Sequence, residues 1–124
     1  MCYPMGMPSD HQPLLRRAYA HFNAREIDAA VALMHPDVDW PNGFEGGREH
    51  GRAAVRAYWA RQFEQIDPEV EPTAFSTRPD GSIAVAVHQT VRDLAGATLV
   101  DGPVTHVWTV DDDGLVTRME IEPG

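Results

Sequence analysis

The residue pattern of this chain changes completely at Asp67-Pro68. Before this point, apolar residues recur at spacings of three and four, which is typical of helices that bury one face. After it, the chain is rich in Val, Thr and Ile and is divided by hairpin-type turns, which is typical of strands. Helices first and strands last predict an α+β domain, with three helices packed on one face of a curved, mostly antiparallel sheet.

Three segments of the first half carry the helical pattern. We expect helices over residues 10–22, 26–34 and about 51–66. The second is expected to end at His35-Pro36, because a residue before proline is pushed out of the helical region.

Five strands are expected. The first is short and covers residues 37–40, where Val38 and Trp40 alternate with two aspartates. Gly102-Pro103 predicts a bend or bulge inside one of the long strands. The four long strands are expected at residues 69–78, 82–94, 97–110 and 115–122.

Composition limits the possible partners. We expect one domain over residues 9–124, after a disordered segment at residues 1–8. The formal net charge of −9 argues against nucleic acid and anionic membranes, since both are bound through basic patches. No run approaches the roughly 20 apolar residues of a membrane span. With one cysteine and no features of a secretory signal, the chain is expected in the cytoplasm.

The residue types present also limit the chemistry. The chain has no Lys, which argues against Schiff-base chemistry, and its three serines lie outside any G-x-S-x-G turn. Neither a GxGxxG nor a GxxxxGK[ST] motif is present, and the acidic and histidine residues lack the spacing of a metal site. We therefore expect neither cofactor nor metal. Carboxylates, His, Tyr, Trp and Arg remain, and they favour proton transfer.

Four segments spread over most of the chain resemble a known superfamily: RAYAHFNAREIDAAVALMHPDVDWPNG, GRAAVRAYW, GPVTHVW and DGLVTRMEI. Together with the order of elements, they resemble the nuclear transport factor 2-like superfamily, which includes ketosteroid isomerases and SnoaL-type polyketide cyclases. The resemblance implies a cone-shaped, cystatin-like domain with a pocket between the helices and the concave sheet. It also implies a small hydrophobic molecule as ligand and a homodimer through the outer sheet face.

The resemblance argues against ketosteroid isomerase activity. Carried over residue by residue, the isomerase's general-base Asp falls on Trp40, its oxyanion-hole Tyr on Ala18, and its protonated Asp on Thr105. Tyr19 is adjacent to the expected position, but one residue turns a helical side chain by about 100 degrees.

SnoaL-type cyclases suggest a different pair of catalytic residues. They use a His and an acidic residue on neighbouring strands, for which His88 and Asp101 are the counterparts here. Similarity to scytalone dehydratases, which use two strand histidines, would pair His88 with His106. Strand alternation, however, is expected to place His106 and Trp108 on the outer face, at the dimer interface.

The predicted function is cofactor-free general acid–base catalysis on a hydrophobic or polyketide-like carbonyl compound, of the cyclase, isomerase or dehydratase type. The alternative is a non-catalytic protein that binds a small ligand or acts as an accessory protein. The residues expected to line the pocket are Ala18, Phe22, Met34, Trp40, Trp59, Phe63, Thr105, Val107 and Met119.

Overall fold

The computed structural model describes residues 11–124, so the predicted disordered segment at residues 1–8 lies outside the described residues. Three helices are present, and none within the described range is long and apolar enough to cross a membrane. The first and the third lie close to the ranges that the spacing of apolar residues predicts. The helices are α1 (Gln12–Asn23), α2 (Ile27–Val31) and α3 (Arg52–Phe63).

The second helix is shorter than predicted. It ends at Val31, and Met34 already belongs to a strand instead of to the helix. Pro36 favours an extended backbone before it, and the strand has a partner at this point, because the Val116 N–H donates to the Leu33 carbonyl at 3.0 Å. The predicted extension of the helix to residue 34 is therefore wrong.

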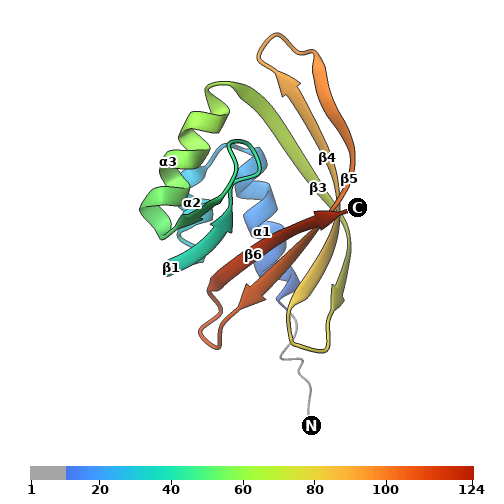
Figure 1. The fold of residues 1–124 in the computed structure, drawn as a ribbon. Helices are drawn as coiled ribbons and strands as arrows, with labels where there is room; N and C mark the ends of the chain where they lie inside the picture. Colours follow the sequence, from blue (N-terminus) through green and yellow to red (C-terminus); the bar gives the residue numbers. More distant parts are fainter. Residues whose placement is uncertain (1–10) are drawn as a thin grey trace.

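All strands belong to one six-stranded sheet, in the order β2-β1-β6-β5-β4-β3 (Figure 1). β1 and β6 run parallel, and every other neighbouring pair is antiparallel, which confirms the mostly antiparallel sheet. The three-residue strand β2 was not predicted. The strands are β1 (Met34–Pro41), β2 (Arg48–His50), β3 (Ile66–Thr77), β4 (Ile83–Asp93), β5 (Thr98–Val110) and β6 (Val116–Pro123).

The predicted bend or bulge at Gly102-Pro103 is wrong. The pairing of β4 with β5 runs through this dipeptide without a shift of register. The shift lies instead beside Leu99, because Val91 pairs with Val100 and the next residue of β4 pairs with Thr98. The turn end of the β4–β5 hairpin therefore takes the distortion, and the pairing of β4 with β5 stays regular from Val100 to Trp108.

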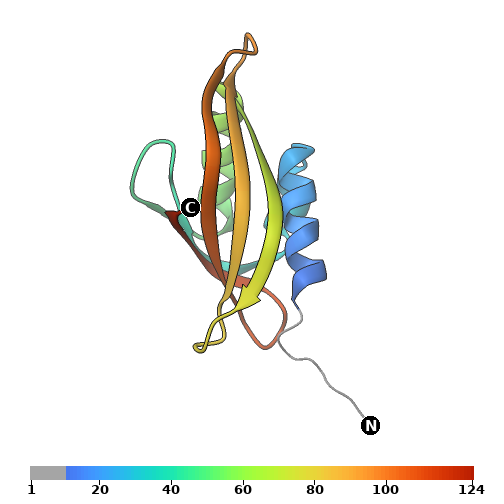
Figure 2. The ribbon, with the colours of Figure 1, turned by 90° about the vertical axis from the view of Figure 1, so that its right-hand side faces the viewer.

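The two faces of β5 are the reverse of the predicted assignment. Trp108 and His106 lie on the face toward the helices, where Tyr19 of α1 contacts both. Thr105 and Val107 alternate with them and lie on the other face. Figure 2 looks onto this other face of β3, β4 and β5, which no helix covers.

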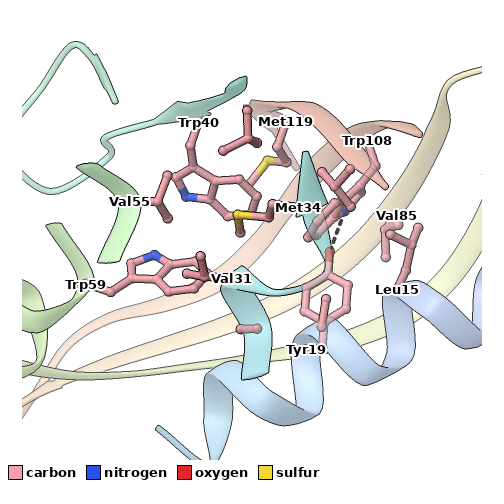
Figure 3. Close-up of a cluster of buried hydrophobic side chains, with 14 of the residues drawn as sticks. Leu15, Tyr19, Val31, Met34, Trp40, Val55, Trp59, Val85, Trp108 and Met119 are labelled. Carbon is pink, nitrogen blue, oxygen red and sulfur yellow. Dashed lines mark hydrogen bonds between the residues drawn. The ribbon is translucent and has the colours of Figure 1, made fainter. Parts of the chain in front are cut away.

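The core lies between the helices and the inner face of the sheet. Each layer contributes aliphatic side chains with almost no exposed surface, and Figure 3 shows Leu15, Val31, Val55 and Val85 among aromatic rings. Burial of a side chain of this size contributes about 1.5–3 kcal/mol. The largest fully buried side chains are Leu15, Val31, Val38, Val55, Val85 and Val116.

Candidate active site: an aromatic cavity with a buried tyrosine–histidine pair

A cavity of about 350 Å³ lies between the helices and the sheet. Small-molecule sites typically have volumes of about 300–1,000 Å³, so this one has room for a compact ligand. Aromatic and aliphatic side chains form most of the wall. Within the described residues, the wall contains no Asp, Glu, Arg or Lys side chain.

Three aromatic residues form a hydrogen-bonded group at the floor of this cavity. Trp108 Nε1–H donates to Tyr19 Oη at 3.0 Å, and Tyr19 Oη lies 2.8 Å from His106 Nδ1. All three side chains line the cavity, and they are only 3%, 4% and 7% exposed. In Figure 3, Tyr19 rises from α1 with its hydroxyl toward Trp108.

Burial determines the charge state of this group. It lowers the pKa of His106 to about 4, so the imidazole is neutral at physiological pH. Burial also raises the pKa of the Tyr19 hydroxyl, against a smaller lowering by the Trp108 hydrogen bond, so the phenol keeps its proton. Two neutral groups that each give and accept a proton therefore face an apolar space. Which nitrogen of His106 carries the proton decides which of them donates.

Two further tryptophans extend the aromatic wall. The ring of Trp40 lies edge-on to Trp59 and to Trp108, with centroids 5.4 Å apart in each pair. Phe22 of α1 packs in the same way against Trp59 at 5.3 Å. Edge-to-face pairs of this kind hold rings in fixed orientations, so the wall is built before a ligand arrives.

The loop between β1 and β2 closes one side of the cavity mouth. Phe44 of this loop lines the cavity while 36% exposed. Asn42 fixes the loop, because its Oδ1 accepts from the backbone N–H groups of Phe44 and Glu45 and its Nδ2 donates to Glu45 and Glu49. Arg61 of α3 then binds both carboxylate oxygens of Glu45, at 2.9 and 3.1 Å.

The sequence model of the SnoaL-like domain family matches residues 15–119 of this chain. The chain belongs to this SnoaL-like family. No curated protein sequence matches it.

Several solved structures share the fold of this chain along nearly its whole length. The chain is 29% identical to TerC, which was co-crystallised with polyporic acid, with a TM-score of 0.79 over 95% of this chain and 92% of TerC. It is 22% identical to SalBIII, an epoxide hydrolase/cyclase-like enzyme in pyran ring formation in the polyether salinomycin, with a TM-score of 0.78 and 94% of each chain covered. It is 18% identical to RV0760c from Mycobacterium tuberculosis, solved in complex with estradiol-17β-hemisuccinate, with a TM-score of 0.77 over 94% and 93% of the two chains. The last two likenesses support the fold alone.

Most of the residues predicted to line the pocket of this SnoaL-like domain do so. Phe63, Thr105 and Val107 are the exceptions. Thr105 and Val107 lie on the opposite face of β5, and Phe63 packs instead against Phe22 and the Arg25 guanidinium. The predicted residues that line the cavity are Ala18, Phe22, Met34, Trp40, Trp59 and Met119.

His88 and Asp101 come together as the strand pairing predicts, but they do not face the cavity. Their side chains are joined at 2.5 Å between Nε2 and Oδ1, and they are 50% and 57% exposed. Neither lines the cavity, because Gln89, the next residue of β4, points inward. The prediction that the pair faces the cavity is therefore wrong.

The sequence interpretation missed Tyr19 and His106 by one residue each. The positions carried over from the isomerase fell on Ala18 and Thr105, whereas the structure places Tyr19 and His106 in contact at the cavity floor. Trp40 lines the cavity, and its neighbour Asp39 instead binds Arg48. One signal in the sequence could have indicated the inward face of β5. Val104, His106 and Trp108 alternate along this strand, and they are bulkier than the threonine-rich residues between them.

Proposed function

We propose that this SnoaL-like protein is a cofactor-free enzyme that moves a proton on a small hydrophobic carbonyl compound, with Tyr19 and His106 as the reacting pair. The observation that carries the proposal is their 2.8 Å contact at the floor of an uncharged aromatic cavity. A neutral imidazole offers a lone pair that can take a proton, and a neutral phenol offers a hydrogen-bond donor for a developing enolate oxygen. The similarity to TerC, co-crystallised with polyporic acid, supports a small-molecule ligand.

The proposed step uses one tautomer of His106. With the proton on Nδ1, His106 and Trp108 both donate to Tyr19 Oη, which leaves the Tyr19 hydrogen free to bond a substrate carbonyl. His106 Nε2 then carries a lone pair and takes a proton from the carbon beside that carbonyl. The resulting enolate oxygen is stabilised by Tyr19, and the imidazolium returns its proton to carbon, either at the same position or at a conjugated one.

Exchange of carbon-bound hydrogen tests this proposal without knowledge of the natural product. We expect the protein to accelerate H-to-D exchange next to the carbonyl of 2-tetralone in D₂O, measured by proton NMR. Removal of a general base or an oxyanion donor typically costs about 100-fold or more, so we expect that loss for both His106→Gln and Tyr19→Phe.

His88→Gln separates the two candidate sites. Because His88 lies on the other face of the sheet, exchange by this variant is expected to match that of the unmodified protein. A loss in His88→Gln with none in the two cavity variants would instead support the exposed pair. Binding of the ketone without any exchange above buffer would favour the alternative function, a ligand-binding protein without turnover.

A further inference from the structure

The cavity has two chemically different ends. The floor holds Tyr19 and His106, which are almost fully buried. The mouth near the β4–β5 hairpin is marked by Val100, which lines the cavity but is 46% exposed. Two polar side chains of the wall, Gln62 and Gln89, have no place in the proton transfer proposed above, which leaves them available for ligand recognition.

Gln89 is the first of these groups. It lines the cavity from β4, and its partner across the strands is Gly102 of β5. Gly102 has no side chain, and a Cβ atom built there would meet no atom within 4 Å. The strand pairing therefore leaves open space beside the Gln89 carboxamide on the cavity side of the sheet.

Gln62 is the second polar group. It lies in the last turn of α3, and its Nε2 donates to Tyr58 Oη at 3.4 Å. Its Oε1 is buried without a hydrogen-bond partner in the described part of the chain. A buried acceptor without a donor is unfavourable, so rotation of this carboxamide toward the cavity to meet a ligand hydroxyl would supply a missing interaction.

The separation of the two ends follows from the register of β5. Gln89 pairs with Gly102, and His106 lies four residues further along β5 on the same face. At 3.2–3.4 Å per residue, this is about 13 Å of strand. The side chains around the space between them are apolar, so a rigid body of two or more rings fits it better than a flexible polar chain.

We propose that the cavity takes an uncharged, elongated aromatic molecule with two polar ends. Tyr19 and His106 bind the reacting end, and the carboxamides of Gln62 and Gln89 bind a hydroxyl at the far end. This assignment rests on the proposed function, because it takes the floor as the reacting end. Lack of charge follows from the wall, which offers no charged side chain within the described residues to pair with a ligand charge.

A matched pair of probes tests the far end. 4-Hydroxybiphenyl has one polar end and 4,4′-dihydroxybiphenyl has two. Trp40, Trp59 and Trp108 line the cavity, so a bound probe quenches their fluorescence and binding can be measured from that loss. One net hydrogen bond contributes roughly a threefold to tenfold gain in affinity, in addition to the statistical factor of about two from the symmetry of the diol. We expect the diol to bind more tightly by that combined amount.

Variants of the two glutamines show which residue produces the gain in affinity for the diol. Gln89→Leu and Gln62→Leu are each expected to reduce the gain while keeping the affinity for the one-ended probe. Gln65→Leu is the matched control, because Gln65 is exposed just beyond α3 and does not line the cavity. Three outcomes would each overturn the proposal. The diol could bind more tightly by no more than the statistical factor, the gain could survive in both variants, or neither probe could bind.

Failure of the two-ended binding mode can be distinguished from failure of the proposed proton transfer. Loss of ketone exchange with a diol gain that still depends on the glutamines would refute the proton transfer and keep the two-ended binding mode. Exchange that depends on Tyr19 and His106, without any diol gain, would refute only the recognition of the far end.

Discussion

At the scale of single residues, the cavity floor depends on one shared hydroxyl. Tyr19 Oη is contacted by both Trp108 Nε1 and His106 Nδ1, so two buried polar groups from β5 depend on one side chain of α1. Buried polar groups are costly without partners, and networks of this kind are stable only when every member is satisfied. The same contact that we assign to catalysis therefore also joins the first helix to the sheet.

The depressed pKa of His106 predicts that stability falls in mild acid. The pKa of His106 is about 6.5 in the unfolded chain and about 4 in the folded one. Above pH 6.5 the imidazole is neutral in both states, so its protonation costs no stability there. As the pH falls from 6.5 towards 4, only the unfolded state takes up the proton. The free energy of unfolding should therefore decrease by about 3 kcal/mol over this window.

Urea unfolding at a series of pH values checks this prediction. His106→Gln should lack this part of the pH dependence, since it has no group to protonate. The same change between pH 6.5 and 4.5 in both proteins would show that His106 is not the group responsible.

At the scale of elements, the β1–β2 loop depends on Asn42. Its side chain is 3% exposed, and it bonds two backbone N–H groups and two carboxylates. Asn42→Ala leaves the N–H groups of Phe44 and Glu45 without their acceptor and removes the donor between Glu45 and Glu49. We expect a loss of about 1–3 kcal/mol in the free energy of unfolding, together with faster ligand release because Phe44 is less firmly held.

The control for this loop is an exposed polar residue directly after α3. Glu64→Ala changes an exposed side chain at the end of that helix and should leave both stability and release rate unchanged. Equal behaviour of the Asn42 and Glu64 variants in chemical unfolding and stopped-flow release would contradict the role given to Asn42.

The periodicity of apolar residues was sufficient to predict most of the helices and strands, but not the residues of the candidate site. The spacing of apolar residues in α1 and α3 and the hairpin turns of the second half predict the α+β order correctly. β2 has only three residues and no readable alternation. The inward face of β5 was assigned wrongly because valines occur on both of its faces. Its true direction depends on the contact of Tyr19 with His106, 87 positions apart in sequence, which no local pattern contains.

At the scale of the whole molecule, the open face of the sheet carries small side chains among charged ones. Ala84, Ala86 and Thr105 lie on it, beside the His88–Asp101 pair. The dimer was predicted because both faces of β5 carry apolar groups and helices cover only one of them; the structure places Thr105 and Val107, instead of His106 and Trp108, on the open face. A homodimer through this face remains a prediction, on the ground that no helix covers it in the described residues.

Sedimentation at high micromolar concentration checks the dimer. We expect twice the chain mass of 13.7 kDa, and a shift to the monomer in Ala86→Arg, which places a charge on the open face. Ala60→Arg on the exposed side of α3 is the matched control. A monomer in the unmodified protein would refute the prediction.

The position of β6 has a consequence for synthesis on the ribosome. β6 lies between β1 and β5, so it alone joins the β2–β1 hairpin to the β5–β4–β3 meander by backbone hydrogen bonds. Both parts are translated before it. Until residues 116–123 emerge, each part exposes its own wall of the future cavity to water, and the nascent chain carries two unpaired sheet edges. A pause or a frameshift before the codons of residues 116–123 would therefore leave chains that cannot close the sheet and are prone to aggregate.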